Sequence, residues 1–374
     1  MRWPGSLFFK RIALLLISVS FALLVLEILL RVVSPPSPWS PLLPLRPKNR
    51  MELHVNLKGV SPVAIHSTNS LGLRGDEPPA NWNQSYTIVT IGGSTTQCFF
   101  LDDHKTWPYL LGQDLKDKYE NVWVGNGGLD GQTTRAHIIF MEEVISRLRP
   151  KAVALLVGAN DLGLSLREDR RLRGNGFDAG KPIWYIRFFG RSRLFQILYL
   201  WKQALFDDVK VVNKSGDGDQ TFKPLPRGAE QLPADLRTLL PTLNEYRQNI
   251  ERIIQLGRSY NVRVVFLTQP LLYEDTEYWK GIEGNFYWIN QTKGRLSAAT
   301  YWKLLDIYNK TLLETCAKEK VECFDLASAI PHDRNYFYDN GHFKKRGATL
   351  VAEQVAAFLK QSPDRDQVPL VASH

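Results

Sequence analysis

An unbroken apolar run near the N-terminus is the strongest pattern in the sequence. Residues 12–30 are almost wholly apolar, and about 20 such residues in a helix cross the hydrocarbon core of a bilayer. Lys10 and Arg11 precede the run, and no small-residue cleavage site follows it. We therefore expect residues 1–33 to form a short cytoplasmic tail and one uncleaved transmembrane anchor. Basic residues beyond the run weaken the charge bias that sets this orientation.

Glu27 is the only ionisable residue inside that run. It lies near one end, and Arg31 follows four residues later, at the spacing where side chains on one helix face meet. We expect the pair to neutralise itself near the lipid headgroups, because an unpaired carboxylate inside a membrane is costly. A functional acid within the membrane is the alternative.

Beyond the anchor, short apolar runs alternate with longer helical patterns. A proline-rich stretch at residues 34–62 lacks clear periodicity and is expected to be a stiff spacer. Buried parallel strands are expected at residues 87–91, 122–124, 152–157, 262–267 and 321–326. Helices are expected at residues 107–118, 136–147, 236–259, 301–318 and 350–359. This alternation predicts a three-layer α/β fold on a five-stranded parallel sheet.

The alternation predicts one large domain over residues 63–361, followed by a flexible tail at 362–374. Residues 162–232 interrupt the pattern as a long aromatic and basic insertion. Within it, residues 191–206 have an amphipathic helical pattern whose apolar positions are Leu194, Leu198, Trp201 and Leu205. We expect a lid helix that packs on the domain. A helix lying in the membrane interface is the alternative.

Charge narrows the choice of partners only a little. The chain has 374 residues, is 44% hydrophobic and carries a formal net charge of +9. Such a charge suits an anionic lipid surface, an acidic polysaccharide or an ordinary basic surface. No zinc-knuckle spacing or RNA-binding signature accompanies it, so no nucleic acid partner is expected.

Three cysteines are too few for a disulfide scaffold, and they lack the spacing of a zinc site. Cys98 stands alone, close to a candidate nucleophile. Cys316 and Cys323 fall near the end of one expected helix and in the strand that follows it. We expect two buried free thiols there, although an oxidising compartment could join them.

Residues able to carry chemistry follow three of the expected strands. Ser94 stands on a glycine-rich turn after the first strand, where the carboxyl end of a parallel sheet exposes side chains to ligands. After the second strand, Gly131 ends a glycine-rich turn and can present a backbone N–H to a ligand. After the third, Asn160 can donate its side-chain amide to a developing oxyanion. Taken separately, each motif is more often a structural turn.

An acid and a base stand together near the end of the expected domain. Asp339 and His342 are three residues apart on the connection before the last helix. At that spacing a carboxylate can hold one ring nitrogen while the other faces a serine hydroxyl. The ordered set of serine, glycine, asparagine and this Asp–His pair carries more weight than any one member.

The ordered set resembles the SGNH, or GDSL-like, hydrolase family over residues 87–359. The resemblance implies a flavodoxin-like fold and a nucleophile, a base and an orienting acid. These would be Ser94, His342 and Asp339. It also implies an oxyanion hole, which would consist of Ser94, Gly131 and Asn160. Where the family's name-giving motif reads Gly-Asp-Ser-Leu, this chain has Gly-Gly-Ser-Thr, which leaves the subfamily open.

Two further motifs, at residues 69–75 and 106–108, resemble those of bacterial SGNH proteins that carry a single anchor. The resemblance implies a single-pass protein of the inner (cytoplasmic) membrane. Its catalytic domain would lie on the periplasmic or extracellular side.

The candidate residues predict a serine esterase that needs neither a metal nor an organic cofactor. Aromatic residues follow the strand at residues 262–267, and the substrate-binding residues we expect are Trp279, Tyr287 and Trp288. Flat rings can stack on sugars, which favours a small acyl ester, acetyl above all, on a cell-envelope polysaccharide. Two alternatives are that these rings form a core of their own or that they line a pocket for an acyl chain.

Three rival functions use the same chain. An acyltransferase would pass the acyl group to a surface polysaccharide through the same residues. A lipid esterase would take a long acyl chain from the nearby membrane. A catalytically silent binding protein would keep the motifs without the reaction.

Overall fold

The computed structural model describes residues 5–33, 43, 45–166, 190, 192–206, 213–215, 222–284 and 296–361. The chain divides into two units. The first comprises Met1–Leu43 and Pro182–Val209, and the second comprises Pro44–Lys181 and Lys210–His374. The flexible tail expected at residues 362–374 lies outside the described residues.

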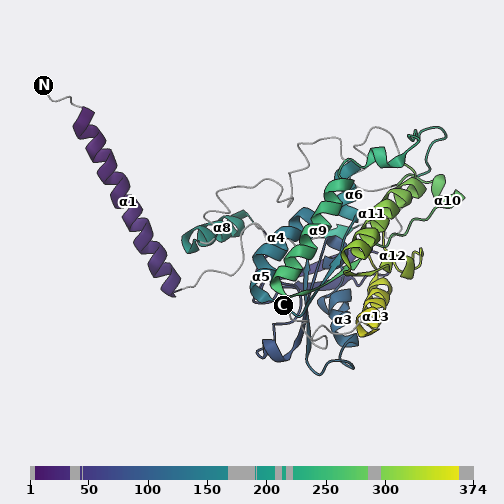
Figure 1. Cartoon of the computed structure of the whole chain (residues 1–374), viewed down its shortest axis with the longest axis horizontal. Coiled ribbons are helices and arrows are strands. Elements are labelled where there is room, and N and C mark those ends of the chain that lie inside the picture. Colours follow the sequence, from purple (N-terminus) through teal and green to yellow (C-terminus); the bar gives the residue numbers. More distant parts are fainter. Residues whose placement is uncertain are drawn as a thin grey trace, which may run out of the picture. The chain divides into compact units, whose positions relative to one another are not determined.

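The second unit is built on a five-stranded parallel sheet in the order β4-β3-β5-β7-β8 (Figure 1). Its strands are β3 (Tyr86–Gly92), β4 (Val122–Gly128), β5 (Ala152–Leu156), β7 (Arg263–Leu267) and β8 (Glu322–Phe324). All residues of β5 and β7 are buried, as strands covered on both faces should be. The predicted three-layer α/β fold with five parallel strands is confirmed.

Helices cover both faces of this sheet. The described helical elements of the second unit are η1 (Trp82–Gln84), α2 (Ser94–Gln97), η2 (Asp103–Lys105), α3 (Trp107–Asp114), α4 (Thr134–Phe140), η3 (Met141–Ile145), α5 (Ser146–Leu148), α6 (Ala159–Leu166), η5 (Leu236–Leu239), α9 (Leu243–Tyr260), α10 (Glu277–Lys280), α11 (Ala298–Glu319), α12 (Leu326–Ala329) and α13 (Lys345–Gln361). α3 packs against α13, while α9 packs against α4 and α11. Figure 1 shows these two groups on opposite sides of the sheet, as right-handed crossovers require.

The long helix expected at residues 236–259 is in fact two elements. A short 3₁₀ turn, η5, comes first, and α9 begins only at Leu243. Pro241 stands between them. Proline lacks an N–H for the helical ladder and disfavours helical backbone in the residue before it, which explains the break.

The expectation of a spacer at residues 34–62 is wrong for its last part, which belongs to a small second sheet. β1 (Arg50–Asn56) pairs antiparallel with β2 (Val63–Ser67) and parallel with β6 (Asn213–Ser215). β1 therefore occupies part of the stretch 34–62 that we expected to be a spacer. Leu53 and Val55 on β1 are buried, so a period-two alternation is present but too short to stand out among polar neighbours.

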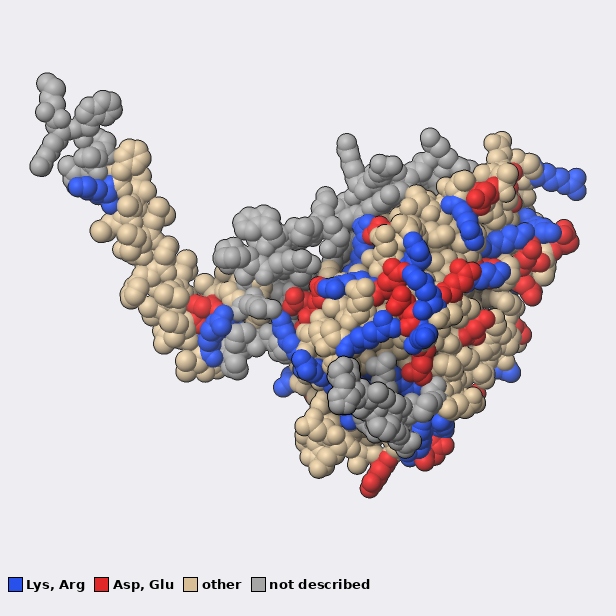
Figure 2. Space-filling view, viewed as in Figure 1, with Lys and Arg blue, Asp and Glu red and all other residues tan. Residues whose placement is uncertain are grey.

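The first unit holds α1 (Gly5–Val33) and α8 (Arg193–Phe206). Phe8–Val33 of α1 is long and apolar enough to cross a membrane, a test that a signal sequence near the N-terminus also passes. Figure 2 shows α1 as an almost uncharged surface with charged side chains only near its two ends. α8 belongs to the same unit as α1, and its packing on the α/β domain as a lid stays a prediction.

Glu27 connects the two helices of this unit. Its carboxylate accepts a hydrogen bond from Arg31 Nε at 2.6 Å, so the expected pairing is confirmed. The same carboxylate accepts from Ser192 Oγ at 2.8 Å and from the backbone N–H groups of Arg193 at 2.9 Å and Leu194 at 3.0 Å. Nothing in the sequence indicates this second role of Glu27, because its partners lie 165 residues or more further along the chain.

Cys316 and Cys323 are joined by a disulfide, with their Cα atoms 6.1 Å apart. The expectation of two free thiols there is therefore wrong. Lys320 follows the last residue of α11, and its left-handed backbone reverses the chain towards β8. This reversal brings the two cysteines together. Cys98 is free and buried, and burial raises the pKa of its thiol to about 11.

Candidate active site

The turn that carries Ser94 is shaped by two glycines at the end of β3. Ser94 is the first residue of α2, and Gly93 is its N-cap. A Cβ on Gly92 would lie 2.9 Å from the carbonyl oxygen of Leu156, and a Cβ on Gly93 would collide with the amide nitrogen of Asn160. Glycines at both positions therefore let the turn approach β5 and Asn160 closely.

Ser94, His342 and Asp339 form a hydrogen-bonded row. Ser94 Oγ lies 2.8 Å from His342 Nε2, and His342 Nδ1 lies 2.7 Å from Asp339 Oδ2. The three residues come from opposite ends of the domain sequence but meet at the carboxyl edge of the sheet, where ligands bind in folds of this type. The spacing fits a hydroxyl nucleophile with a base and an acid that orients the base.

Asp339 is held in place by its own turn. Its Oδ1 accepts from the N–H groups of Gly341 at 2.9 Å and His342 at 2.7 Å. Burial alone would raise the pKa of Asp339, but the neighbouring His342 and these hydrogen bonds outweigh burial and hold that pKa below its usual value. An ionised Asp339 keeps a hydrogen on Nδ1, which leaves Nε2 of the neutral imidazole as an acceptor for the Ser94 hydroxyl.

The imidazole is also held from the side. The ring of Tyr338 stacks on that of His342 with centroids 5.5 Å apart and an interplanar angle of 7°. Tyr338 in turn packs against Phe100 edge-on. The orientation of His342 is thus set by a carboxylate at one nitrogen and by an aromatic ring across its face.

The expected oxyanion donors lie on the neighbouring connections. Gly131 follows β4 with a φ of +70°, and a Cβ placed there would meet nothing within 4 Å. Asn160 begins the turn after β5, and its Nδ2 donates to the carbonyl of Gln132 at 2.8 Å. An amide nitrogen has two hydrogens, so one remains for a ligand. The Ser94 N–H is at a helix N-terminus, where backbone donors lack intrahelical acceptors.

Of the three expected substrate-binding residues, the structure describes one, Trp279. Tyr287 and Trp288 lie outside the described residues. Trp279 is buried, with its ring packed against those of Phe222, Tyr273 and Tyr278. These contacts match the alternative in which the rings form a core of their own. Tyr278 is the member of this cluster with an exposed ring, at 56% exposure.

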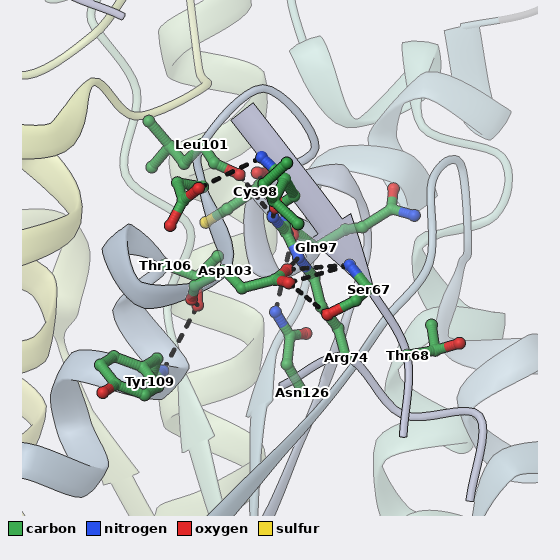
Figure 3. A network of polar contacts seen from close by, with 12 residues as sticks. Ser67, Thr68, Arg74, Gln97, Cys98, Leu101, Asp103, Thr106, Tyr109 and Asn126 are labelled. Carbon is green, nitrogen blue, oxygen red and sulfur yellow. Dashed lines mark hydrogen bonds and ion pairs between the residues drawn. The ribbon is translucent and has the colours of Figure 1, made fainter. Parts of the chain in front are cut away.

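A buried ion pair that the sequence does not reveal lies beside the turn at residues 94–98, called the nucleophile turn below. Arg74 Nε lies 2.6 Å from Asp103 Oδ1, and both side chains are almost fully buried. Figure 3 shows the Arg74 guanidinium between Asp103 and the chain at Gln97 and Cys98. Arg74 belongs to the motif at residues 69–75, which marks it as a residue of interest. The motif does not indicate which residues Arg74 contacts.

A hydroxyl, an imidazole and a carboxylate bonded in a row at the carboxyl edge of a parallel sheet are typical of serine hydrolases with an α/β fold. The model of the GDSL-like lipase/acylhydrolase family matches residues 90–350. The chain belongs to this family, and the resemblance to the SGNH hydrolases is confirmed. The protein is accordingly an ester-hydrolysing enzyme.

Several solved structures are similar to the chain at low sequence identity. A lipolytic protein of the G-D-S-L family from Desulfitobacterium hafniense is 14% identical with a TM-score of 0.39, over 73% of this chain and 99% of that one. TesA is 14% identical with a TM-score of 0.42, over 73% and 98%. Axe2, an acetylxylan esterase from Geobacillus stearothermophilus, is 13% identical with a TM-score of 0.40, over 74% and 93%. No curated protein sequence matches the chain significantly.

Proposed function

We propose that this enzyme is a serine esterase in which Ser94 is the nucleophile, His342 the base and Asp339 the acid that orients the base. The observation that carries the proposal is the continuous row from Ser94 Oγ to His342 Nε2, at 2.8 Å, and from His342 Nδ1 to Asp339 Oδ2, at 2.7 Å. Both distances are those of ordinary hydrogen bonds, so no rearrangement is needed before proton transfer.

The reaction has two halves. Ser94 Oγ attacks the ester carbonyl carbon while His342 Nε2 removes the hydroxyl proton. The bond to the alcohol then breaks, and His342 returns the proton to the leaving oxygen. In the second half, His342 Nε2 takes a proton from water while the water oxygen attacks the acyl carbon. The bond from that carbon to Ser94 Oγ then breaks, and His342 gives its proton to Ser94 Oγ as the acid leaves. Asp339 stabilises the imidazolium that forms in each half.

The oxyanion of each tetrahedral intermediate is stabilised by three donors. They are the N–H groups of Ser94 and Gly131 and the side-chain amide of Asn160. One such donor lowers the barrier by about 3 kcal/mol. The proposal is supported by the free hydrogen on Asn160 Nδ2 and by the open space at Gly131.

The substrate we propose is a small acyl ester, acetyl above all, on a cell-envelope polysaccharide. It rests on the aromatic segment after β7, of which Tyr278 is exposed on α10 and Lys280 lies two residues further. An exposed ring can stack on a sugar and a lysine can meet an acidic group. α1 anchors the enzyme in the inner membrane with the domain on the periplasmic or extracellular side. A disulfide between Cys316 and Cys323 fits that oxidising location.

Nitrophenyl esters from acetyl to decanoyl, together with an acetylated glycan, test the substrate class. The full chain in detergent should hydrolyse the acetyl ester fastest and release acetate from the glycan, and Ser94→Ala should do neither. Rates that rise towards decanoyl would identify a lipid esterase instead. Acetyl transfer to an added oligosaccharide in preference to water would identify an acyltransferase.

A further inference from the structure

The turn that follows Ser94 is bound by side chains along its whole length. Each of the four backbone carbonyls of residues 95–98 accepts a hydrogen bond from a side chain elsewhere in the chain. Trp107 Nε1 donates to the carbonyl of Thr95 at 3.2 Å, and Asn126 Nδ2 donates to that of Thr96 at 3.0 Å. Arg74 Nη1 donates to the carbonyls of Gln97 at 2.6 Å and Cys98 at 2.8 Å. Carbonyls at the end of a helix have no intrahelical donor, so these side chains replace what a longer helix would supply.

The donors are themselves fixed. Trp107 and Arg74 are 0% and 3% exposed, and Arg74 is paired with Asp103, whose carboxylate also accepts from the N–H of Ser67 at 2.9 Å. Arg74 and Asn126 exchange backbone hydrogen bonds of 2.8 and 3.1 Å. Figure 3 shows the side chains of Arg74 and Asn126 converging on the chain at Gln97.

We propose that Trp107, Asn126 and Arg74 are positioning residues that fix the height and direction of the Ser94 hydroxyl. The inference rests on the proposed role of Ser94. A four-residue helix such as α2 has too few internal bonds to hold its first residue within the few tenths of an ångström that nucleophilic attack requires. The side chains that bind its carbonyls supply that rigidity from outside, and two of them come from the motifs at residues 69–75 and 106–108.

A matched pair of tryptophan variants tests this role. Trp107→Phe keeps a buried ring but loses the donor to the nucleophile turn. Trp123→Phe loses an equivalent donor, since Trp123 Nε1 binds the carbonyl of Asp76 at 3.1 Å, away from that turn. We expect Trp107→Phe to lower kcat about tenfold at unchanged KM, because small misplacements of a reacting group are costly. We expect Trp123→Phe to remain within about twofold of the parent.

A second pair separates positioning from stability. Arg74→Lys and Arg263→Lys both weaken an arginine that is 3% exposed and paired with a carboxylate, and Arg263 pairs with Glu322 at the far end of β7. Both variants should lose similar amounts of denaturant resistance. Only Arg74→Lys should slow the phosphonylation of Ser94 by an activated phosphonate, which needs no substrate binding.

These outcomes decide the inference separately from the proposed function. An active Ser94→Ala variant would show that Ser94 is not the nucleophile, and the proposed positioning role would then be wrong as well. An inactive Ser94→Ala together with parental kcat and phosphonylation rate in both Trp107→Phe and Arg74→Lys would overturn the positioning role alone. Losses of kcat that are equal within each matched pair would do the same, since they would report stability only.

A second inference comes independently from α8. The first N–H groups of α8, which lack intrahelical acceptors, donate to Glu27 near the C-terminal end of α1. Leu198 and Trp201 on α8 are 56% and 69% exposed. α8 therefore begins where the apolar helix ends and presents large apolar side chains to the solvent.

The sequence around α8 has the composition of a segment that binds a membrane surface. Residues 181–206 contain five Lys and Arg and no Asp or Glu, and they are rich in aromatic residues. Basic and aromatic residues with an amphipathic pattern are typical of helices that lie in the headgroup region. We propose that α8 lies along an anionic lipid surface with Leu198 and Trp201 inserted, held there by the carboxylate of Glu27. This inference rests on the proposal that α1 spans a membrane.

Spin labels on single cysteines test this inference in the full chain, reconstituted in vesicles of phosphatidylcholine and phosphatidylglycerol. The parent is the labelling control, because Cys98 is buried and Cys316 and Cys323 are bonded. Leu198→Cys should be more accessible to oxygen than to a water-soluble nickel chelate. Gln203 follows Leu198 by five residues, a rotation of about 140° in a regular α-helix. A label at Gln203→Cys should therefore be more accessible to the nickel chelate than to oxygen.

A label at Leu23→Cys on α1 separates the two proposals. If it is shielded from nickel while Leu198→Cys and Gln203→Cys are equally exposed to nickel, α1 spans the membrane and the inference about α8 is wrong. If the α1 label is itself exposed to nickel, both proposals fail. Glu27→Ala should move the Leu198→Cys label towards water, and no movement would overturn the holding role of Glu27.

Discussion

His342 and Asp339 stand three residues apart on one turn, whereas Ser94 stands on a turn whose carbonyls are bound from elsewhere in the chain. The Asp339 carboxylate accepts from the N–H groups of residues 341 and 342. The nucleophile turn, by contrast, is bound by donors 12 to 30 residues away in the sequence. The acid–base half of the site is thus a local structure, and the nucleophile half is a product of tertiary packing.

This difference has a consequence for how each half fails. A local turn keeps its geometry as long as its own few residues are intact. A turn held by distant side chains depends on the packing of several elements, so substitutions far from the substrate can disturb it. We therefore expect changes on the His342 side to act only at the reacting groups, and changes on the Ser94 side to act at a distance as well.

The largest effect should come from the two reacting groups themselves. Ser94→Ala and His342→Ala should each lower kcat by about 10³-fold or more, because either one removes the proton-transfer pair. Both side chains lie on connections at the edge of the sheet, so the unfolding midpoint in urea should change little. Purified variants that keep activity within about tenfold of the parent would contradict the proposed roles.

Two buried carboxylates, one from each half, sharpen the comparison. Asp339→Asn should lower kcat by about 10²-fold or more with little loss of stability, because the amide no longer fixes the reactive tautomer. Asp103→Asn should instead cost about 3 to 5 kcal/mol of unfolding free energy, because it leaves the buried Arg74 guanidinium without its partner. Activity per folded molecule and urea unfolding measure the two effects. The comparison breaks down if both variants lose mainly stability.

Asn160→Ala should have the next largest effect. Loss of one oxyanion donor lowers kcat about 10²-fold while KM changes little, because the donor acts on charge that exists only in the transition state. Steady-state kinetics on the acetyl ester measure both constants. An effect confined to KM would mean that Asn160 binds substrate and not the oxyanion.

The same contrast explains what the sequence could and could not predict. The five strands are predictable because buried parallel strands appear in the sequence as short apolar runs, and the Asp339–His342 pair is predictable because its spacing is local. Arg74 and Asp103 were not paired, because nothing in the sequence shows which distant residues a buried arginine will meet. The contact of Glu27 with Arg31 is predictable from their spacing, whereas its contacts with α8 are not, since those partners lie far along the chain.

The smallest effect tests whether the buried Asp339 carboxylate is ionised as its environment implies. Its pKa in the folded protein is held below its usual value, so it contributes stability that is fully present above the unfolded-state value of about 3.9. That contribution is lost as the pH falls through the lower, folded-state value. The unfolding free energy of the parent, measured in urea from about pH 6 downwards, should therefore exceed that of Asp339→Asn by an amount that shrinks below about pH 4. Asparagine has the same shape but does not titrate, so the difference isolates this one group. A difference that stays constant into acid would mean that Asp339 is held by its turn alone and that its charge contributes nothing to the folded state.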